Sequence, residues 1–73
     1  MNSERLINVV LLELSIEKLK IEDGLERVFD SSDDITSKSY TIKELVARLV
    51  TVENTIEKFN SMILKNNESK KTD

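Results

Sequence analysis

The chain has 73 residues, of which 38% are hydrophobic and 34% are charged, and its 11 Lys and Arg against 14 Asp and Glu give a net charge of -3. It contains no cysteine and no histidine, so it cannot form a disulfide, a thiol nucleophile, an imidazole base or a zinc site of the usual kind. We therefore predict a single small domain that is not an enzyme and takes no metal or cofactor, and the acidic balance argues against a nucleic-acid partner.

The first predicted element is a helix over about residues 3–29. Ser3 is a favourable residue at a helix start, and Glu4 lies in the first turn, where the helix dipole favours an acidic side chain. One apolar stripe of this helix consists of Ile7, Val10, Leu11, Leu14, Ile21, Leu25 and Val28. A second stripe, which we expect roughly a third of a turn away around the helix, consists of Val9, Leu12, Ile16 and Leu19.

Two features of this segment favour other interpretations. Residues 12–17 alternate between apolar and polar side chains, which is also typical of a half-buried strand, and Val9 and Val10 are β-branched. Gly24 costs about 1 kcal/mol in a helix interior, and Asp23 with Glu26 has the spacing of a capping pair. The sequence therefore leaves open a strand over residues 9–17 and a kink near Gly24.

A polar connector is predicted over about residues 30–40, because serine, threonine and aspartate side chains bond to nearby backbone there. Its length permits an antiparallel hairpin. Asp30, Asp33 and Asp34 offer oxygen ligands to a cation, but an EF-hand loop needs glycine at its sixth position and glutamate at its twelfth. Ile35 and Thr41 occupy those positions, so we predict no calcium site.

The second predicted helix covers about residues 41–65. Thr41 is the predicted cap, Glu44 completes a capping box, and Tyr40 is expected to pack on Leu45 as a hydrophobic staple. The apolar residues then follow alternating steps of three and four, as in a coiled coil: Ile42, Leu45, Leu49, Val52, Ile56, Phe59 and Ile63. Residues 66–73 are polar and predict a disordered tail.

The predicted fold is all-α: one domain over residues 1–65, built as a two-helix antiparallel hairpin with coiled-coil-like packing. Its core combines the second-helix residues with Ile7, Leu14, Ile21 and Val28. A single hairpin covers only one of the two stripes on the first helix, so the other requires a further partner. We therefore expect Val9, Leu12, Ile16 and Leu19 to contact a second copy, in a dimer or higher homo-oligomer that completes a helical bundle, or another protein.

The location of the chain is also predicted. The longest apolar run, residues 6–12, is interrupted by Asn8 and falls short of the roughly 20 residues that a membrane helix needs. Glu4 before the run and Glu13 after it do not fit a secretory signal. We expect no membrane association and a cytoplasmic location, which would be that of a bacterial host if the chain is phage-encoded.

The layout of the chain resembles a known group of small proteins. An acidic chain with a helical first segment, a Ser/Asp-rich connector and a closing helix that opens with Tyr-Thr-Ile-Lys-Glu-Leu-Val at residues 40–46 is similar to the short tail-fibre assembly chaperones of large tailed phages. This resemblance implies a phage origin and a role in assembly. Small plasmid copy-number regulators also dimerise as helical hairpins, but this chain lacks the basic and aromatic face with which they hold RNA.

We therefore predict a non-enzymatic protein–protein interaction module, such as an assembly factor or chaperone. The alternative is a phage- or plasmid-type regulator or inhibitor that binds host transcription or defence proteins, acting through the acidic residues of the connector and of the first helix. A nucleic-acid-binding regulator is the third possibility, and the net charge of -3 disfavours it most.

Overall fold

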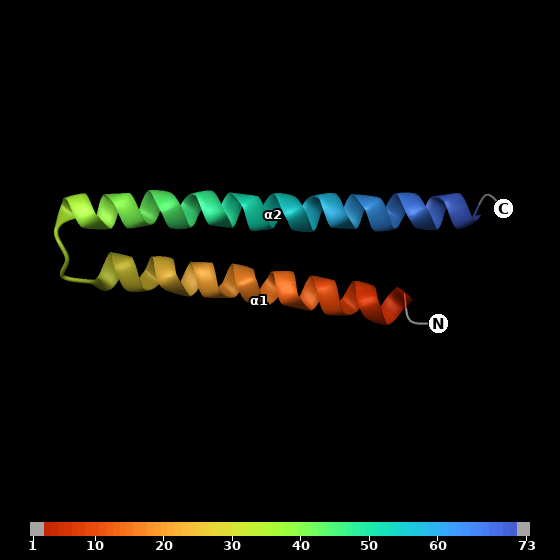
Figure 1. Cartoon of the computed structure of the whole chain (residues 1–73), viewed down its shortest axis with the longest axis horizontal. Helices are drawn as coiled ribbons and strands as arrows, with labels where there is room; N and C mark the ends of the chain where they lie inside the picture. The colour runs from red at the N-terminus through yellow and green to blue at the C-terminus, as the bar shows by residue number, and fades with distance from the viewer. Residues whose placement is uncertain (1–2, 72–73) are drawn as a thin grey trace.

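The chain folds into two antiparallel helices that lie side by side (Figure 1). A computed structural model describes residues 3–71, with side chains described for residues 3–66. Helix α1 (Ser3–Asp30) and helix α2 (Ile35–Lys71) are joined by a turn over residues 31–34, and no strand occurs within the described residues. The all-α helical hairpin predicted from the sequence is confirmed.

The hairpin is a thin rod with little interior. Its Cα radius of gyration is 17.1 Å and its principal extents are 59 × 18 × 11 Å, whereas a globular domain of this length has a radius of about 11 Å. Within residues 3–66, only Ile21 and Val52, which are 8% and 4% exposed, are buried. Almost every other apolar side chain of the described hairpin therefore keeps part of its surface in water.

The core lies along the contact between the two helices. The structure places all of the predicted core side chains on the facing sides of α1 and α2, where each is buried or half-buried: Ile7, Leu14, Ile21 and Val28 from α1, and Ile42, Leu45, Leu49, Val52, Ile56, Phe59 and Ile63 from α2. An ion pair between Lys18 Nζ and Glu53 Oε2, at 3.5 Å, crosses the same contact. The two helices therefore meet along the single apolar seam that the heptad spacing of α2 defines.

Helix α1 runs without interruption from Ser3 to Asp30, so the strand interpretation of residues 9–17 and the break near Gly24 are both wrong. Gly24 has no left-handed backbone conformation, and it faces α2. A Cβ atom built at Gly24 would lie 3.6 Å from Leu45 Cδ1. The glycine is tolerated because helix packing, rather than local propensity, decides the conformation of this segment.

Helix α2 begins at Ile35, so the predicted start at Thr41 is wrong. Asp34 directly precedes the first turn, where aspartate is among the preferred capping residues. The Asp34 carbonyl accepts a hydrogen bond from the Lys38 backbone N–H at 3.0 Å, which closes the first helical turn. The serine-rich residues that suggested a connector therefore belong to the helix, which begins before them at Ile35.

The predicted capping box and hydrophobic staple are also absent from the place assigned to them. Glu44 lies inside α2, and its Oε1 pairs with Arg48 Nη2 at 3.0 Å, one helical turn along. The Tyr40 side chain is 71% exposed, so it does not pack on Leu45 as a staple. A Thr-x-x-Glu spacing is common within helices, and it marks a start only where no earlier cap competes.

The turn between the helices is only four residues long, over 31–34, instead of the predicted connector over 30–40. The Ser31 hydroxyl donates to the Val28 carbonyl at 3.0 Å, and the Ser31 backbone N–H donates to the same oxygen at 3.2 Å. The Lys38 ammonium donates to the Phe29 carbonyl at 3.2 Å. These bonds satisfy carbonyls at the end of α1, where cationic and hydroxyl donors are favourable.

Helix α2 continues through Lys71, past the predicted end near residue 65. The predicted disordered tail over residues 66–73 is therefore wrong as far as Lys71, and residues 72–73 lie outside the described part of the chain. Because α2 has 37 residues and α1 has 28, α2 extends beyond the start of α1 (Figure 1).

Candidate functional site

The second stripe of α1 is the most extended apolar surface of the hairpin that the structure leaves in solvent. Its side chains are exposed by 43–63%: Val9, Leu12, Ile16 and Leu19. All four follow helical spacing on one helix, and none lies in the seam with α2. Isolated exposed apolar side chains are ordinary, whereas a continuous line of them is typical of an interaction surface.

The stripe lies farther from α2 than the sequence-based interpretation placed it. Val9 follows the seam residue Ile7 by two positions, and Ile16 follows Leu14 by two. Each residue advances by about 100° around an α-helix, so this offset is about 200°. The two apolar stripes of α1 therefore lie on nearly opposite sides of the helix, and of the second stripe Leu19 borders a depression that Leu49 of α2 also lines.

Other exposed apolar side chains are more scattered. They lie at the start of α1, beside the turn, or along α2: Leu6, Phe29, Ile35, Tyr40, Val46, Val50, Met62 and Leu64. Val46 and Met62 flank the apolar seam of α2, and both are exposed. No run of four at helical spacing occurs among these residues, so α2 contributes no equivalent of the second stripe within residues 35–66.

Charged side chains bound the second stripe at both ends. Arg5 precedes it and lines a surface depression with Glu4, Asn8, Val9 and Leu12. Asp23 follows the stripe, and its carboxylate pairs with Arg27 at 2.7 Å within α1. The surface thus has a basic end, an apolar middle and an acidic end.

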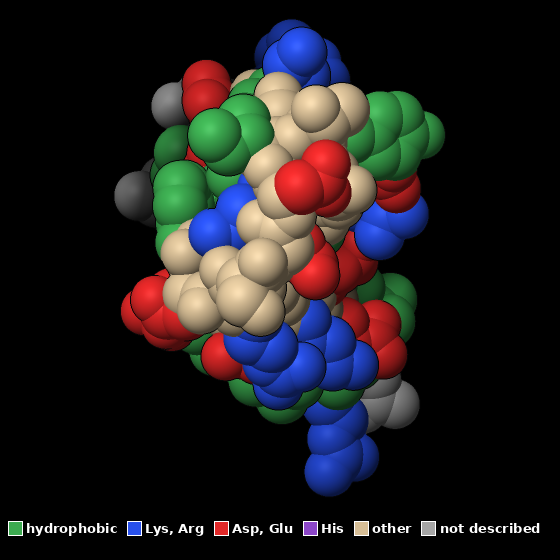
Figure 2. Space-filling view, turned by 90° about the vertical axis from the view of Figure 1, so that its left-hand side faces the viewer, with side chains coloured by type: hydrophobic (Ala, Val, Ile, Leu, Met, Phe, Trp, Pro, Cys, Tyr) green, Lys and Arg blue, Asp and Glu red, His purple; other side chains and the backbone are tan. Residues whose placement is uncertain are grey.

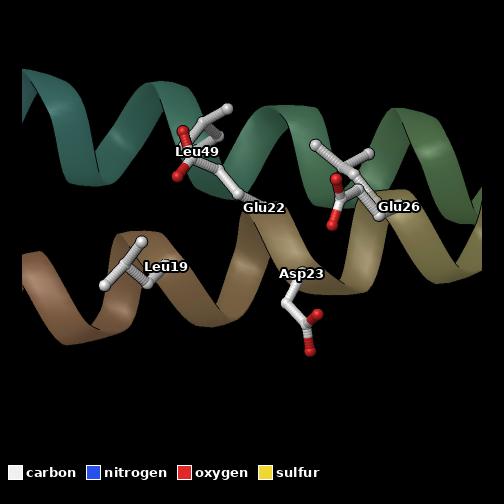
Figure 3. A pocket seen from close by; sticks show the side chains of 6 residues that line it. Leu19, Glu22, Asp23, Glu26 and Leu49 are labelled. Atoms are coloured by element: carbon white, nitrogen blue, oxygen red, sulfur yellow. The ribbon is translucent and has the colours of Figure 1, made fainter.

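The acidic end of the stripe adjoins a second depression, which is open to solvent (Figure 3). In Figure 3, Glu22 and Glu26 extend beside α2, whereas Asp23 points away from it. Its lining side chains are Leu19, Glu22, Asp23, Leu25, Glu26 and Leu49. Three carboxylates around exposed leucine carbon suit a basic or amphipathic surface rather than an enclosed small molecule.

The turn end of the hairpin is polar. Seen from that end, backbone and uncharged polar side chains occupy the centre, acidic and basic side chains lie around them, and hydrophobic side chains show mainly at the edges (Figure 2). Asp33 and Asp34 are exposed there, and Lys38 lies beside them in sequence on the first turns of α2. Within residues 3–66 no group of three or more acidic side chains is arranged to hold a metal ion.

Neither helix of the described chain contains an apolar stretch sufficient for a membrane crossing. Glu13 and Glu17, one turn apart on α1, are both exposed, so the paired carboxylates of this helix lie on a solvated face.

The fold and this surface define a class of protein: a two-helix hairpin with one unpaired apolar helix face. Comparison of the chain with models of protein families, with curated protein sequences and with solved structures finds no match.

Proposed function

We propose that this protein is a non-enzymatic protein–protein interaction module, of the kind that serves as an assembly factor or chaperone. The second stripe is its contact surface. The observation that carries this proposal is the line of four apolar side chains, Val9, Leu12, Ile16 and Leu19, exposed by 43–63% on the side of α1 turned away from α2.

The scarcity of buried side chains supports an association role. Only two side chains of the described hairpin are buried, and neither is larger than isoleucine. Covering an exposed leucine or isoleucine completely contributes about 1.5–3 kcal/mol. A partner on the second stripe adds this burial while α1 is already helical, so no further backbone ordering opposes it.

The chemistry of the surface indicates a protein partner. Its apolar middle is one side chain wide and follows the length of α1 for about 15 Å, from Val9 to Leu19, which matches the face of another helix. Its ends carry opposite charges, Arg5 and Asp23. An apolar helix face with charged ends suits a helix of a second copy or of another protein.

A pair of charge substitutions tests the proposal. In Leu12→Glu/Leu19→Glu the stripe is made acidic without placing charge in the seam with α2. Leu64→Glu is the matched control, because Leu64 is 64% exposed and lies on α2, whereas Leu12 and Leu19 are 61% and 63% exposed. Size-exclusion chromatography with light scattering gives the mass, and circular dichroism gives the helix content.

We expect the wild type and Leu64→Glu to elute as assemblies of the 8.4 kDa chain, and Leu12→Glu/Leu19→Glu to elute as smaller, less stable species. Loss of both mass and helix content in the double variant alone would also support the proposal, since it would show that the hairpin depends on its covered stripe. Unchanged mass and unchanged helix content in the double variant would overturn it.

A further inference from the structure

We propose that the occupant of the second stripe is a second copy of this chain, paired through α1 in antiparallel orientation about a two-fold axis at the level of Leu14. In this arrangement Arg5 of each copy faces Asp23 of the other. The inference rests on the proposed function and goes further, because it names the partner, its direction and its register.

The stripe is symmetric about its own midpoint. An antiparallel pair centred on residue 14 places each position beside the position that lies equally far on the other side of the axis. Val9 therefore lies beside Leu19 of the other copy, and Leu12 beside Ile16. Every apolar residue of the stripe therefore meets an apolar residue of the other copy, as along the seam of a coiled coil.

The charges at the two ends also obey this symmetry. Arg5 and Asp23 each lie nine positions from Leu14. Arg5 and Asp23 are 18 positions apart, which corresponds to about five complete helical turns. Both residues therefore lie on the same side of α1 as the stripe. In the antiparallel pair Arg5 meets Asp23 at both ends of the contact.

A parallel pair would reverse this charge pattern. It would place Arg5 beside Arg5 and Asp23 beside Asp23, so that two like-charge contacts replace two opposite-charge contacts. The antiparallel pair has one unfavourable contact of its own, since Glu13 lies at the rim near the axis and meets its own copy. Each exposed contact is weak, but two attractive pairs against one repulsive pair favour the antiparallel direction.

Both end residues are available for such contacts. Arg5 is exposed and makes no ion pair with any side chain in residues 3–66. The Asp23 side chain is 55% exposed, and it uses one oxygen in its pair with Arg27. A carboxylate accepts several hydrogen bonds, so Asp23 can bind an arginine of the second copy as well.

The position of α2 leaves room for the second copy. Figure 1 shows α2 along one side of α1 only, and the second stripe lies on nearly the opposite side of that helix. Pairing through the stripes therefore places the two α1 helices at the centre and the two α2 helices outside. The seam within each hairpin stays as it is.

Cysteine crosslinking tests the direction of the pair, and the natural chain contains no cysteine to interfere. In the antiparallel pair the two copies of residue 5 lie about 27 Å apart along the helix, whereas residues 5 and 23 of different copies lie side by side. Arg5→Cys and Asp23→Cys are each treated with a short bis-maleimide alone and as a mixture. Asn54→Cys, at an exposed position on α2, serves as the control partner.

We expect the mixture of Arg5→Cys and Asp23→Cys to give a crosslinked dimer at least tenfold more abundant than either variant alone or with Asn54→Cys. Efficient crosslinking of Arg5→Cys to itself would overturn the antiparallel direction. The proposed function is tested separately, by the mass of Leu12→Glu/Leu19→Glu. If that variant dissociates while Arg5→Cys crosslinks to itself, the interaction role stands and only the antiparallel direction fails.

Charge exchange provides an independent readout on the assembled chain. Arg5→Asp and Asp23→Arg should each raise the dissociation constant of the dimer on the order of tenfold at low salt, because each substitution turns two attractions into two repulsions. The double variant Arg5→Asp/Asp23→Arg should return to within about threefold of the wild type. Failure of the double variant to recover would overturn the facing of Arg5 and Asp23.

Discussion

The two helices of this hairpin arrange their apolar residues differently. Helix α2 carries one seam, whose seven predicted residues all lie buried or half-buried against α1. Helix α1 carries that seam's counterpart and, on nearly the opposite side, the second stripe, which remains exposed. Within one hairpin, α1 therefore covers the apolar seam of α2, whereas the second stripe of α1 stays uncovered.

Under the proposed function, this difference separates residues that fold the chain from residues that bind a partner. Seam residues contact each other within one copy, so their substitution changes the free energy of unfolding at any protein concentration. Second-stripe residues contact solvent in one copy, so their substitution changes stability only where a partner is bound. Paired substitutions on the two surfaces measure this separation directly.

The largest effect is expected in the seam. Leu49→Ala should lower the free energy of unfolding by about 2 kcal/mol, at the low end of the range for leucine truncation, because Leu49 is half-buried. Leu12→Ala is the matched substitution in the stripe. At concentrations where the chain is dissociated it should change stability by less than about 0.5 kcal/mol, and denaturant unfolding at several concentrations would show whether its effect grows on association.

A smaller effect of opposite sign is expected at Gly24. An alanine Cβ at this position would make an ordinary contact with Leu45 Cδ1, at 3.6 Å, and would add helix propensity. Gly24→Ala should therefore raise the free energy of unfolding by about 1 kcal/mol. Thermal melting of this variant checks the result, and a lower melting temperature would mean that α1 is not continuous through residue 24.

The smallest effects distinguish the two candidate starts of α2. Asp34→Ala should lower stability by about 0.5–1 kcal/mol, because Asp34 precedes the first turn. Thr41→Ala should change stability by no more than a few tenths of a kcal/mol, because Thr41 lies within the helix, where alanine is a good helix former. A larger loss of stability in Thr41→Ala than in Asp34→Ala would mean that α2 begins at Thr41.

The sequence predicted the two helices of the hairpin, because they follow from periodicity over many residues. The spacing of Ile42 to Ile63 in steps of three and four requires no knowledge of the rest of the chain. The prediction of the helix start was wrong, because a capping spacing also occurs inside helices. Thr41 and Glu44 have that spacing, but Asp34 precedes them and the helix already begins at Ile35.

The angular position of the second stripe was also misjudged, although the residues themselves contain the answer. Two positions along a helix correspond to about 200°, so Val9 had to face away from the seam that includes Ile7. The exposure of Phe29 and Ile35 beside the turn could not be predicted in the same way. It depends on a turn of only four residues, whose length the serine-rich sequence did not reveal.

Sedimentation of the wild-type chain over a range of concentrations, combined with circular dichroism melting of the same samples, tests the central claim most directly. The claim is that the second stripe of α1 is covered by a partner copy. It predicts a mass that is a multiple of 8.4 kDa and a melting temperature that rises with concentration. A single, fully helical 8.4 kDa species with a melting temperature independent of concentration would contradict it.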